Sequence, residues 1–478
     1  MSELASARGI LLPKVIEKNL SYASRLSATA ITVLATTIFA LIPLFVNPFN
    51  AAQFAYQHFW PPKLLLLLGL SALLLAVVLA ATLSRARFRW VPMLLPAAAF
   101  LAISTLSTAF SEDVYLSLVG LTGYYDGLLS VAAGVLLFYA SARFLDSRAK
   151  VRSFLATGVA SATIIAAYGI SQRFGFDPLS GLAAAWPTDY GSRVFSTIGN
   201  PIYLAAYLTL MMGGAAALYF EAVLKWERVL WLSALAVIGA CWFYTYTRGT
   251  VLGVGIALPM VLWFAHRRMG SARPLLVPLG SLAAAVLTAA LLGWYADERP
   301  SQPQGAPTQE AGTLSPAPGV PSRLAQTQDA NLVSRLLIWR DTVPVILERP
   351  LLGHGLDNFP EPFSRYEGED LRAMMEAAQP VPVLIVKAHN ELLQVLATTG
   401  ALGLAAYVWI FFAYFRNTYR CGGWALIALS GGMLAYILQL QTIFTTLTTS
   451  VTFWAVLGVS AAVMRLPDRS GRGGVQPE

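Results

Sequence analysis

The sequence has few charged residues. Asp, Glu, Lys and Arg make up 12% of its 478 residues, whereas soluble domains carry about 25%. Hydrophobic residues account for 56%, and the mean hydropathy is +0.60. This composition excludes a cytosolic enzyme, a disordered chain and a fibrous repeat. No apolar tract alternates with period two, as strands of a membrane barrel do, so we predict an all-α polytopic membrane protein.

Metal-ligating and redox residues are also scarce. The two cysteines, Cys241 and Cys421, form no CxxC pair, and the four histidines are not clustered with carboxylates at ligand spacing. No phosphate-binding loop or dinucleotide fingerprint precedes a predicted strand, which disfavours a soluble nucleotide-dependent enzyme. We therefore expect no disulfide framework, no metal site, no cofactor and no nucleic-acid partner.

Long apolar tracts are abundant instead. About twelve of them have the roughly 20 residues that a helix needs to cross a bilayer. We expect nine spans over 27–295 and three more over 389–465. The tracts cover 27–46, 62–83, 91–109, 124–142, 153–171, 200–222, 229–246, 250–265, 275–295, 392–415, 424–443 and 449–464.

The connections between these tracts alternate in charge. One side receives most of the 33 Lys and Arg, and the other side is acidic overall. By the positive-inside rule, both termini of this multi-pass protein are cytoplasmic. We predict an interfacial cytoplasmic helix over 1–26, with a frayed tail as the alternative, and a cytoplasmic tail over 466–478.

The connection over 296–388 is far longer than ordinary loops, and it lies on the external side. Its first part, 300–328, is rich in Pro, Gln, Ala and Gly, which is typical of a flexible insertion. Apolar periodicity returns afterwards, so we expect amphipathic helices over 331–388 that cover the membrane face as a lid. Pro344 should bend or break the first of them.

Three predicted spans begin on the external face beside a basic or titratable residue. One starts at Asn200-Pro201, an N-cap followed by proline at the first helical position, after Arg193. Another starts after Arg248, and a third at His389-Asn390. Helix N-termini offer unpaired N–H groups and a positive dipole end, so these three together would hold a phosphate group.

Three arginines carry most of the site prediction. Arg248 follows an almost absent loop, where a charge costs free energy unless it faces a cavity; the alternative is an arginine that reaches lipid headgroups. Arg335 and Arg340 are five residues apart in the amphipathic segment, about 140° around a helix. One could face the membrane cavity while the other pairs with Asp341 or solvent. Arginine suits phosphate because its planar guanidinium binds two oxygens at once.

Two histidines and one aromatic group remain. His389 stands directly before a membrane helix, where an imidazole could act as a general base towards a hydroxyl nucleophile. His354 lies in a glycine-flanked turn and is expected to be structural. Tyr124, Tyr125 and Asp126 could hold a sugar, although an interfacial aromatic belt is the simpler interpretation.

Several segments together resemble the O-antigen ligase and O-antigen polymerase family of bacterial membrane glycosyltransferases. The resemblance covers about 190 to 405, with the motifs in the family's order. They are Phe195–Tyr207, Thr245–Thr250, Ser334–Trp339, Pro350–Phe359 and Ala388–Gly403. The Pro-rich insertion at 300–328 departs from the family pattern.

The resemblance implies a GT-C-like fold and a donor glycan linked through pyrophosphate to undecaprenol. It implies transfer to an acceptor hydroxyl at the periplasmic face, with inversion and without metal or nucleotide. The acceptor would be lipid A-core or a similar glycan. Its essential positions correspond to the catalytic residues Arg248, Arg335 and His389. We assign substrate binding to Arg193, Asn200, Arg340 and Asn390.

Three alternatives remain at this point. A polymerase would extend one carrier-linked glycan from another with the same chemistry. A secondary transporter or lipid flippase would also have about twelve helices, but with two similar halves and broken helices at the midplane. A receptor or scaffold would tolerate replacement of Arg248 and His389.

Overall fold

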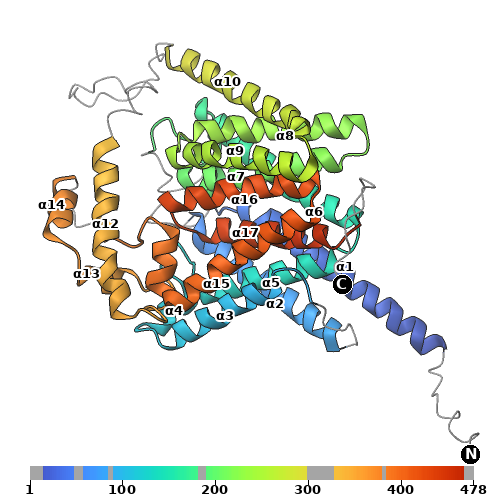
Figure 1. Ribbon diagram of the computed structural model, residues 1–478, viewed down its shortest axis with the longest axis horizontal. Coiled ribbons are helices and arrows are strands. Elements are labelled where there is room, and N and C mark those ends of the chain that lie inside the picture. The colour runs from blue at the N-terminus through green and yellow to red at the C-terminus, as the bar shows by residue number, and fades with distance from the viewer. Residues whose placement is uncertain are drawn as a thin grey trace, which may run out of the picture.

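The computed structural model describes residues 14–47, 58–83, 90–180, 190–298, 328–378 and 384–467. Within them the regular secondary structure is entirely helical (Figure 1). Ten helices are long and apolar enough to cross a membrane, which confirms the all-α polytopic class. These are α1 (Lys14–Leu44), α2 (Trp60–Leu83), α6 (Arg148–Arg173), α7 (Pro201–Glu221), α8 (Lys225–Tyr244), α9 (Arg248–Met269), α10 (Leu276–Glu298), α15 (Glu391–Cys421), α16 (Trp424–Gln439) and α17 (Leu447–Met464).

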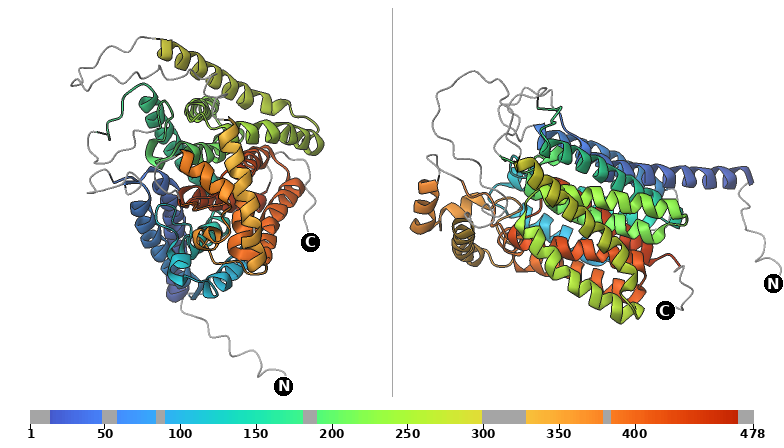
Figure 2. Two further views of the ribbon diagram at one scale, coloured as in Figure 1. Left: turned by 90° about the vertical axis from the view of Figure 1, so that its left-hand side faces the viewer. Right: turned by 90° about the horizontal axis from the view of Figure 1, so that it is seen from above.

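Two shorter apolar helices complete the bundle, and they occupy the tracts expected at 91–109 and 124–142. They are α3 (Leu94–Ala109) and α5 (Leu128–Phe144). The number of spans, twelve, stays a prediction. α1 runs from Lys14 into the first tract without a break and projects away from the bundle (Figure 2). Residues 1–26 were predicted to form a separate interfacial helix. The part of this segment that the structure describes, from Lys14 onward, continues the helix of the first span instead.

The helices lie side by side, and the least exposed spans, α17 and α7, are in the middle (Figures 1 and 2). α7 packs against α16, and α17 against α5. At the crossing of α7 and α16, a Cβ added to Gly213 would lie 3.1 Å from the Gly432 Cα. Small residues let two backbones approach this closely, which is how helices associate in lipid. Exposed apolar side chains cover the outer helices α9 and α10, as lipid contact requires.

The connection between α10 and α15 forms helices at one end of the bundle (left in Figure 1). They are α12 (Gln328–Glu348), α13 (Pro360–Ser364) and α14 (Glu369–Ala378). These helices share a small apolar core that includes Ile338, Val345, Phe359 and Phe363. α12 continues through Pro344 without the expected break. The insertion predicted as flexible, 300–328, lies almost entirely outside the described residues.

α15 is interrupted near its N-terminal end. Gly400 has φ +67°, outside the helical range, and the segment around Pro350–Gly355 passes beside the interruption. There His354 N donates to Ala397 O at 3.1 Å, and Ala401 N donates to Pro350 O at 2.8 Å. The loop segment thus satisfies backbone groups that the broken helix leaves open.

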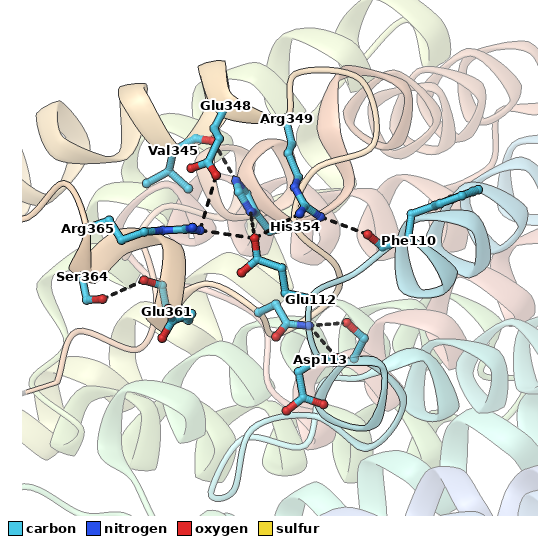
Figure 3. Close-up of polar contacts among 12 residues, drawn as sticks. Phe110, Glu112, Asp113, Val345, Glu348, Arg349, His354, Glu361, Ser364 and Arg365 are labelled. Carbon is cyan, nitrogen blue, oxygen red and sulfur yellow. Dashed lines mark hydrogen bonds and ion pairs between the residues drawn. The ribbon is translucent and has the colours of Figure 1, made fainter.

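Ion pairs fasten the same loop to the bundle (Figure 3). Glu112 lies between α3 and α4 (Val114–Val119). Its Oε1 lies 3.0 Å from an Arg349 guanidinium nitrogen and 3.4 Å from one of Arg365. His354 is buried between these groups, with Nε2 2.9 Å from Val345 O. His354 therefore has the structural position expected from its turn.

Candidate functional site

Three spans begin close together at the end of the bundle that α12 to α14 cover. α7 starts after Asn200, whose Oδ1 accepts from Ile202 N at 2.9 Å. α15 starts after Asn390, whose Oδ1 accepts from Leu393 N at 3.1 Å. Arg248 is the first residue of α9. Both asparagines are therefore true N-caps, as the sequence predicted.

The short connection between α16 and α17 joins these helix starts. Asn390 Nδ2 donates to Gln441 O at 3.2 Å. Gln439 Nε2 donates to Ile202 O at 3.4 Å. On the third side, Gly249 lies directly against Thr442, so closely that a Cβ would clash with its hydroxyl. The residues next to Arg248 and next to His389 thus contact neighbouring positions of one connection.

Arg193 lies beside Arg248. Its Nε donates to Thr245 O at 2.9 Å, and a terminal nitrogen donates to Thr247 Oγ1 at 3.3 Å. Burial lowers the pKa of Arg193, and the positive charge of Arg248 lowers it further. Two guanidinium groups this close repel each other, and a bound anion would relieve the repulsion. The arrangement favours a phosphate group at the start of α9.

Arg335, on α12, lies beside His389. Burial lowers the pKa of His389 to about 4, and the charge of Arg335 contributes. The imidazole is therefore neutral near pH 7 and can accept a hydrogen bond or a proton. Its ring packs against Phe444, with centroids 5.4 Å apart. Phe444 also contacts Tyr203 of α7, 5.9 Å away, so an aromatic cluster links His389 to the start of α7.

Arg340 is not brought to this group. Its Nε lies 2.7 Å from Asp341, and a terminal nitrogen lies 3.0 Å from Asp370 on α14. Arg335 and Arg340 therefore face different surroundings, as their five-residue separation predicted. The substrate-binding role assigned to Arg340 stays a prediction with no support from its contacts.

The sequence analysis missed a buried group of charges beside His389. A cavity of about 50 Å³ is lined by Lys387, Asp357, Asp126 and Glu391. Lys387 Nζ donates to Asp357, and Glu391 accepts from Thr445 N at 2.8 Å. Asp357 and Glu391 lie within two of the motifs, and Lys387 directly precedes one of them. Nothing in the sequence indicated that they meet.

A second cavity lies among the spans. It has a volume of about 120 Å³, and its walls come from α7, α8, α9, α10 and α16. The lining is almost wholly apolar, with Thr209 as its one hydroxyl side chain. Val254 of this lining is less than two helical turns from Arg248 along α9. One side of this apolar cavity therefore lies near the start of α9.

Sequence comparison assigns the region that holds Arg248, Arg335 and His389 to a known protein family. Residues 232–408 match the family described as O-antigen ligase. They form an O-antigen ligase family domain. No curated protein matches the chain. The family match agrees with the resemblance found in the motifs.

The O-antigen ligase domain contains Arg248, Arg335 and His389, whereas Arg193 and Asn200 precede it. The family match and the ten apolar helices together support a multi-pass membrane protein with a domain similar to the O-antigen ligases. Lipid-linked glycans are the substrates that this family implies.

Proposed function

We propose that the protein is a ligase-type glycosyltransferase of the bacterial inner membrane. It moves a glycan from undecaprenyl pyrophosphate to a hydroxyl of lipid A-core or a similar acceptor. The site faces the periplasm, and both termini are cytoplasmic. The observation that carries this proposal is the meeting of the starts of α7, α9 and α15 around residues 439–444, with Arg248 and His389 at two of those starts.

Arg193, Arg248 and the helix starts bind the pyrophosphate in this proposal. The acceptor oxygen attacks the anomeric carbon from the face opposite the diphosphate, so the configuration inverts. The carbon–oxygen bond to the diphosphate breaks, and its electron pair leaves with the diphosphate. Guanidinium groups placed in advance stabilise that developing charge, a task that metal ions perform in other transferases. We therefore propose that no metal is needed.

His389 takes the proton of the acceptor hydroxyl. A pKa of about 4 makes it a weak base in the empty site. A diphosphate beside Arg335 would offset the positive charge that helps to hold this pKa down, so the pKa of His389 rises when the donor binds. The base thus becomes effective when its substrate is present.

The apolar cavity among α7, α8, α9, α10 and α16 receives part of the prenyl chain in this proposal. Its volume of about 120 Å³ holds only a short part of such a chain, so most of the undecaprenyl chain would remain in lipid. Leu282 of α10 and Val261 of α9 both line this cavity. A large polar side chain at either position would hinder the carrier.

The test uses purified protein in nanodiscs with undecaprenyl-pyrophosphate glycan, lipid A-core and a chelator. We expect release of undecaprenyl pyrophosphate together with a new glycolipid. Arg248→Ala and His389→Ala should each lose at least about 100-fold in turnover. Arg372→Ala, on exposed α14, and His266→Ala are the matched controls. Full turnover in His389→Ala would refute the mechanism, and transfer only to a second carrier-linked glycan would identify a polymerase.

A further inference from the structure

Lys387 is a charged residue buried two positions before His389. Lys387 and Asp357 are each 2% exposed, and the ammonium Nζ donates to Asp357 Oδ1. Removing two charges from water is costly, and their attraction compensates only when the geometry is good and the other hydrogen bonds are made. A pair in this place therefore calls for a role other than stability alone.

Asp357 gives Lys387 a fixed partner. Its second oxygen accepts from Leu121 N at 2.8 Å and from Asp126 N at 3.2 Å. Both donors belong to the connection between α4 and α5, far away in the sequence. Lys387 is thus attached, through one carboxylate, to the connection between α4 and α5 in the bundle.

Hydrogen bonds and backbone conformation fix the turn between Lys387 and α15. Ala388 N donates to Gln394 Oε1 at 2.8 Å, and Ala388 O accepts from Trp339 Nε1 at 3.0 Å. His389 then has φ +51°, a left-handed conformation that residues with a side chain rarely adopt. The direction of the imidazole depends on this conformation, because a small change in φ turns the whole ring.

Lys387 and His389 also share an aromatic neighbour. Lys387 Nζ lies 5.6 Å from the centre of the Phe444 ring, against which His389 packs. A cation over an aromatic face is attracted to the ring. The ammonium therefore helps to fix the surface on which the imidazole rests.

We propose that Lys387 is a positioning residue for glycan transfer: its bond to Asp357 and its contact with Phe444 set the orientation of His389. The inference rests on the proposed function, because it assumes that His389 acts on the acceptor hydroxyl. Lys387 itself does not touch the substrates in this proposal.

The charge of Lys387 persists under working conditions. Burial lowers the pKa of Lys387, but the carboxylates of Asp357 and Asp126 raise it more, so the ammonium stays protonated. A neutral side chain here would leave Asp357 unpaired in the interior. Loss of stability and loss of orientation must therefore be separated in any experiment.

Two variants make this separation. Lys387→Met keeps most of the length of the side chain and removes its charge, which leaves Asp357 without its ion-pair partner. Lys387→Met/Asp357→Asn removes both charges, while the amide oxygen can still accept from Leu121. The double variant should regain the melting temperature that the single variant loses. Lys150→Met, which breaks the exposed pair with Asp146, is the control.

We expect kcat in the double variant to remain about 10- to 100-fold below wild type despite the recovered melting temperature. The KM for the lipid-linked donor should stay within about twofold, because the arginines that bind diphosphate are unchanged. A kcat that recovers with the melting temperature, or a raised KM at unchanged kcat, would overturn the inference. If the single variant does not fold, the double variant alone still tests the inference.

His389→Ala, measured alongside, separates the two proposals. If it retains full turnover, His389 is not the base and the positioning role of Lys387 fails with it, whereas absence of glycan transfer by the wild-type protein would refute the proposed function itself. If it is inactive while the double variant has normal kcat, only the role of Lys387 is wrong.

Discussion

Trp339 Nε1 donates to Ala388 O at 3.0 Å, and this bond ties the loop helix α12 to the turn that carries His389. Arg335 is one helical turn before Trp339 on α12 and influences His389 by its charge. The loop helix therefore supplies both a charge and a backbone anchor to the candidate catalytic turn.

Trp339→Phe removes this hydrogen bond and keeps most of the ring. We expect kcat to fall about fivefold, as loss of one net hydrogen bond worth about 1 kcal/mol implies. Trp294→Phe, on the exposed surface of α10, is the matched control and should keep the wild-type rate. Equal rates in the two variants would show that the tether does not affect the turn.

The stability of the protein should depend on pH through His389. The pKa of this imidazole is about 4 when folded and 6.5 in an unperturbed chain. The folded state therefore resists a proton that the unfolded state accepts, so stability falls as the pH drops from about 6.5 to about 4.

His389→Gln removes this contribution. We expect the wild-type melting temperature to fall more than that of the variant between pH 7 and pH 4.5. Asp126, whose pKa burial raises, titrates in both proteins and so cancels in the comparison. Parallel curves for the two proteins would contradict the low pKa of His389.

Gly400→Ala tests the interruption of α15. Gly400 has φ +67°, and a Cβ there would clash with the backbone of Leu351. We expect a loss of at least about 1–3 kcal/mol in the free energy of unfolding, from strain alone. Gly280→Ala in α10, where a Cβ meets no atom within 4 Å, should cost nothing measurable. Thermal melting in detergent compares the two.

Glu112→Gln should loosen the loop without unfolding the bundle. The change weakens the contacts of Glu112 with Arg349 and Arg365 (Figure 3). We expect faster limited proteolysis within 328–378 at an unchanged melting temperature, since local opening costs less than global unfolding. Glu369→Gln on α14 is the control. A cleavage rate equal to that of the control would show that Glu112 does not fasten the loop.

Much of the architecture follows from composition and periodicity. The expected tracts coincide with long helices because a spanning helix must be apolar along its whole length, a signal that local sequence contains. The helix starts at Asn200 and Asn390 were predictable for the same reason, since an N-cap bonds to residues only two or three positions away. Pro344 was expected to bend or break its helix; α12 is not broken there and stays helical beyond it.

Interactions between distant segments were not predictable. Lys387 and Asp357 are thirty positions apart, and either alone is ordinary in a polar loop. Their pairing depends on how the loop crosses the bundle, and a single sequence contains no local signal for that path. The interruption of α15 at Gly400 was missed similarly, because glycine inside an apolar helix is common in membranes.

The passage of Pro350–Gly355 beside the interruption of α15 also constrains the order of assembly. The carbonyl of Ala397 accepts from His354 N, a residue of the preceding loop. This end of α15 therefore completes its backbone hydrogen bonds only when the preceding loop lies against it. The helix that follows His389 thus depends for its shape on a segment synthesised before it.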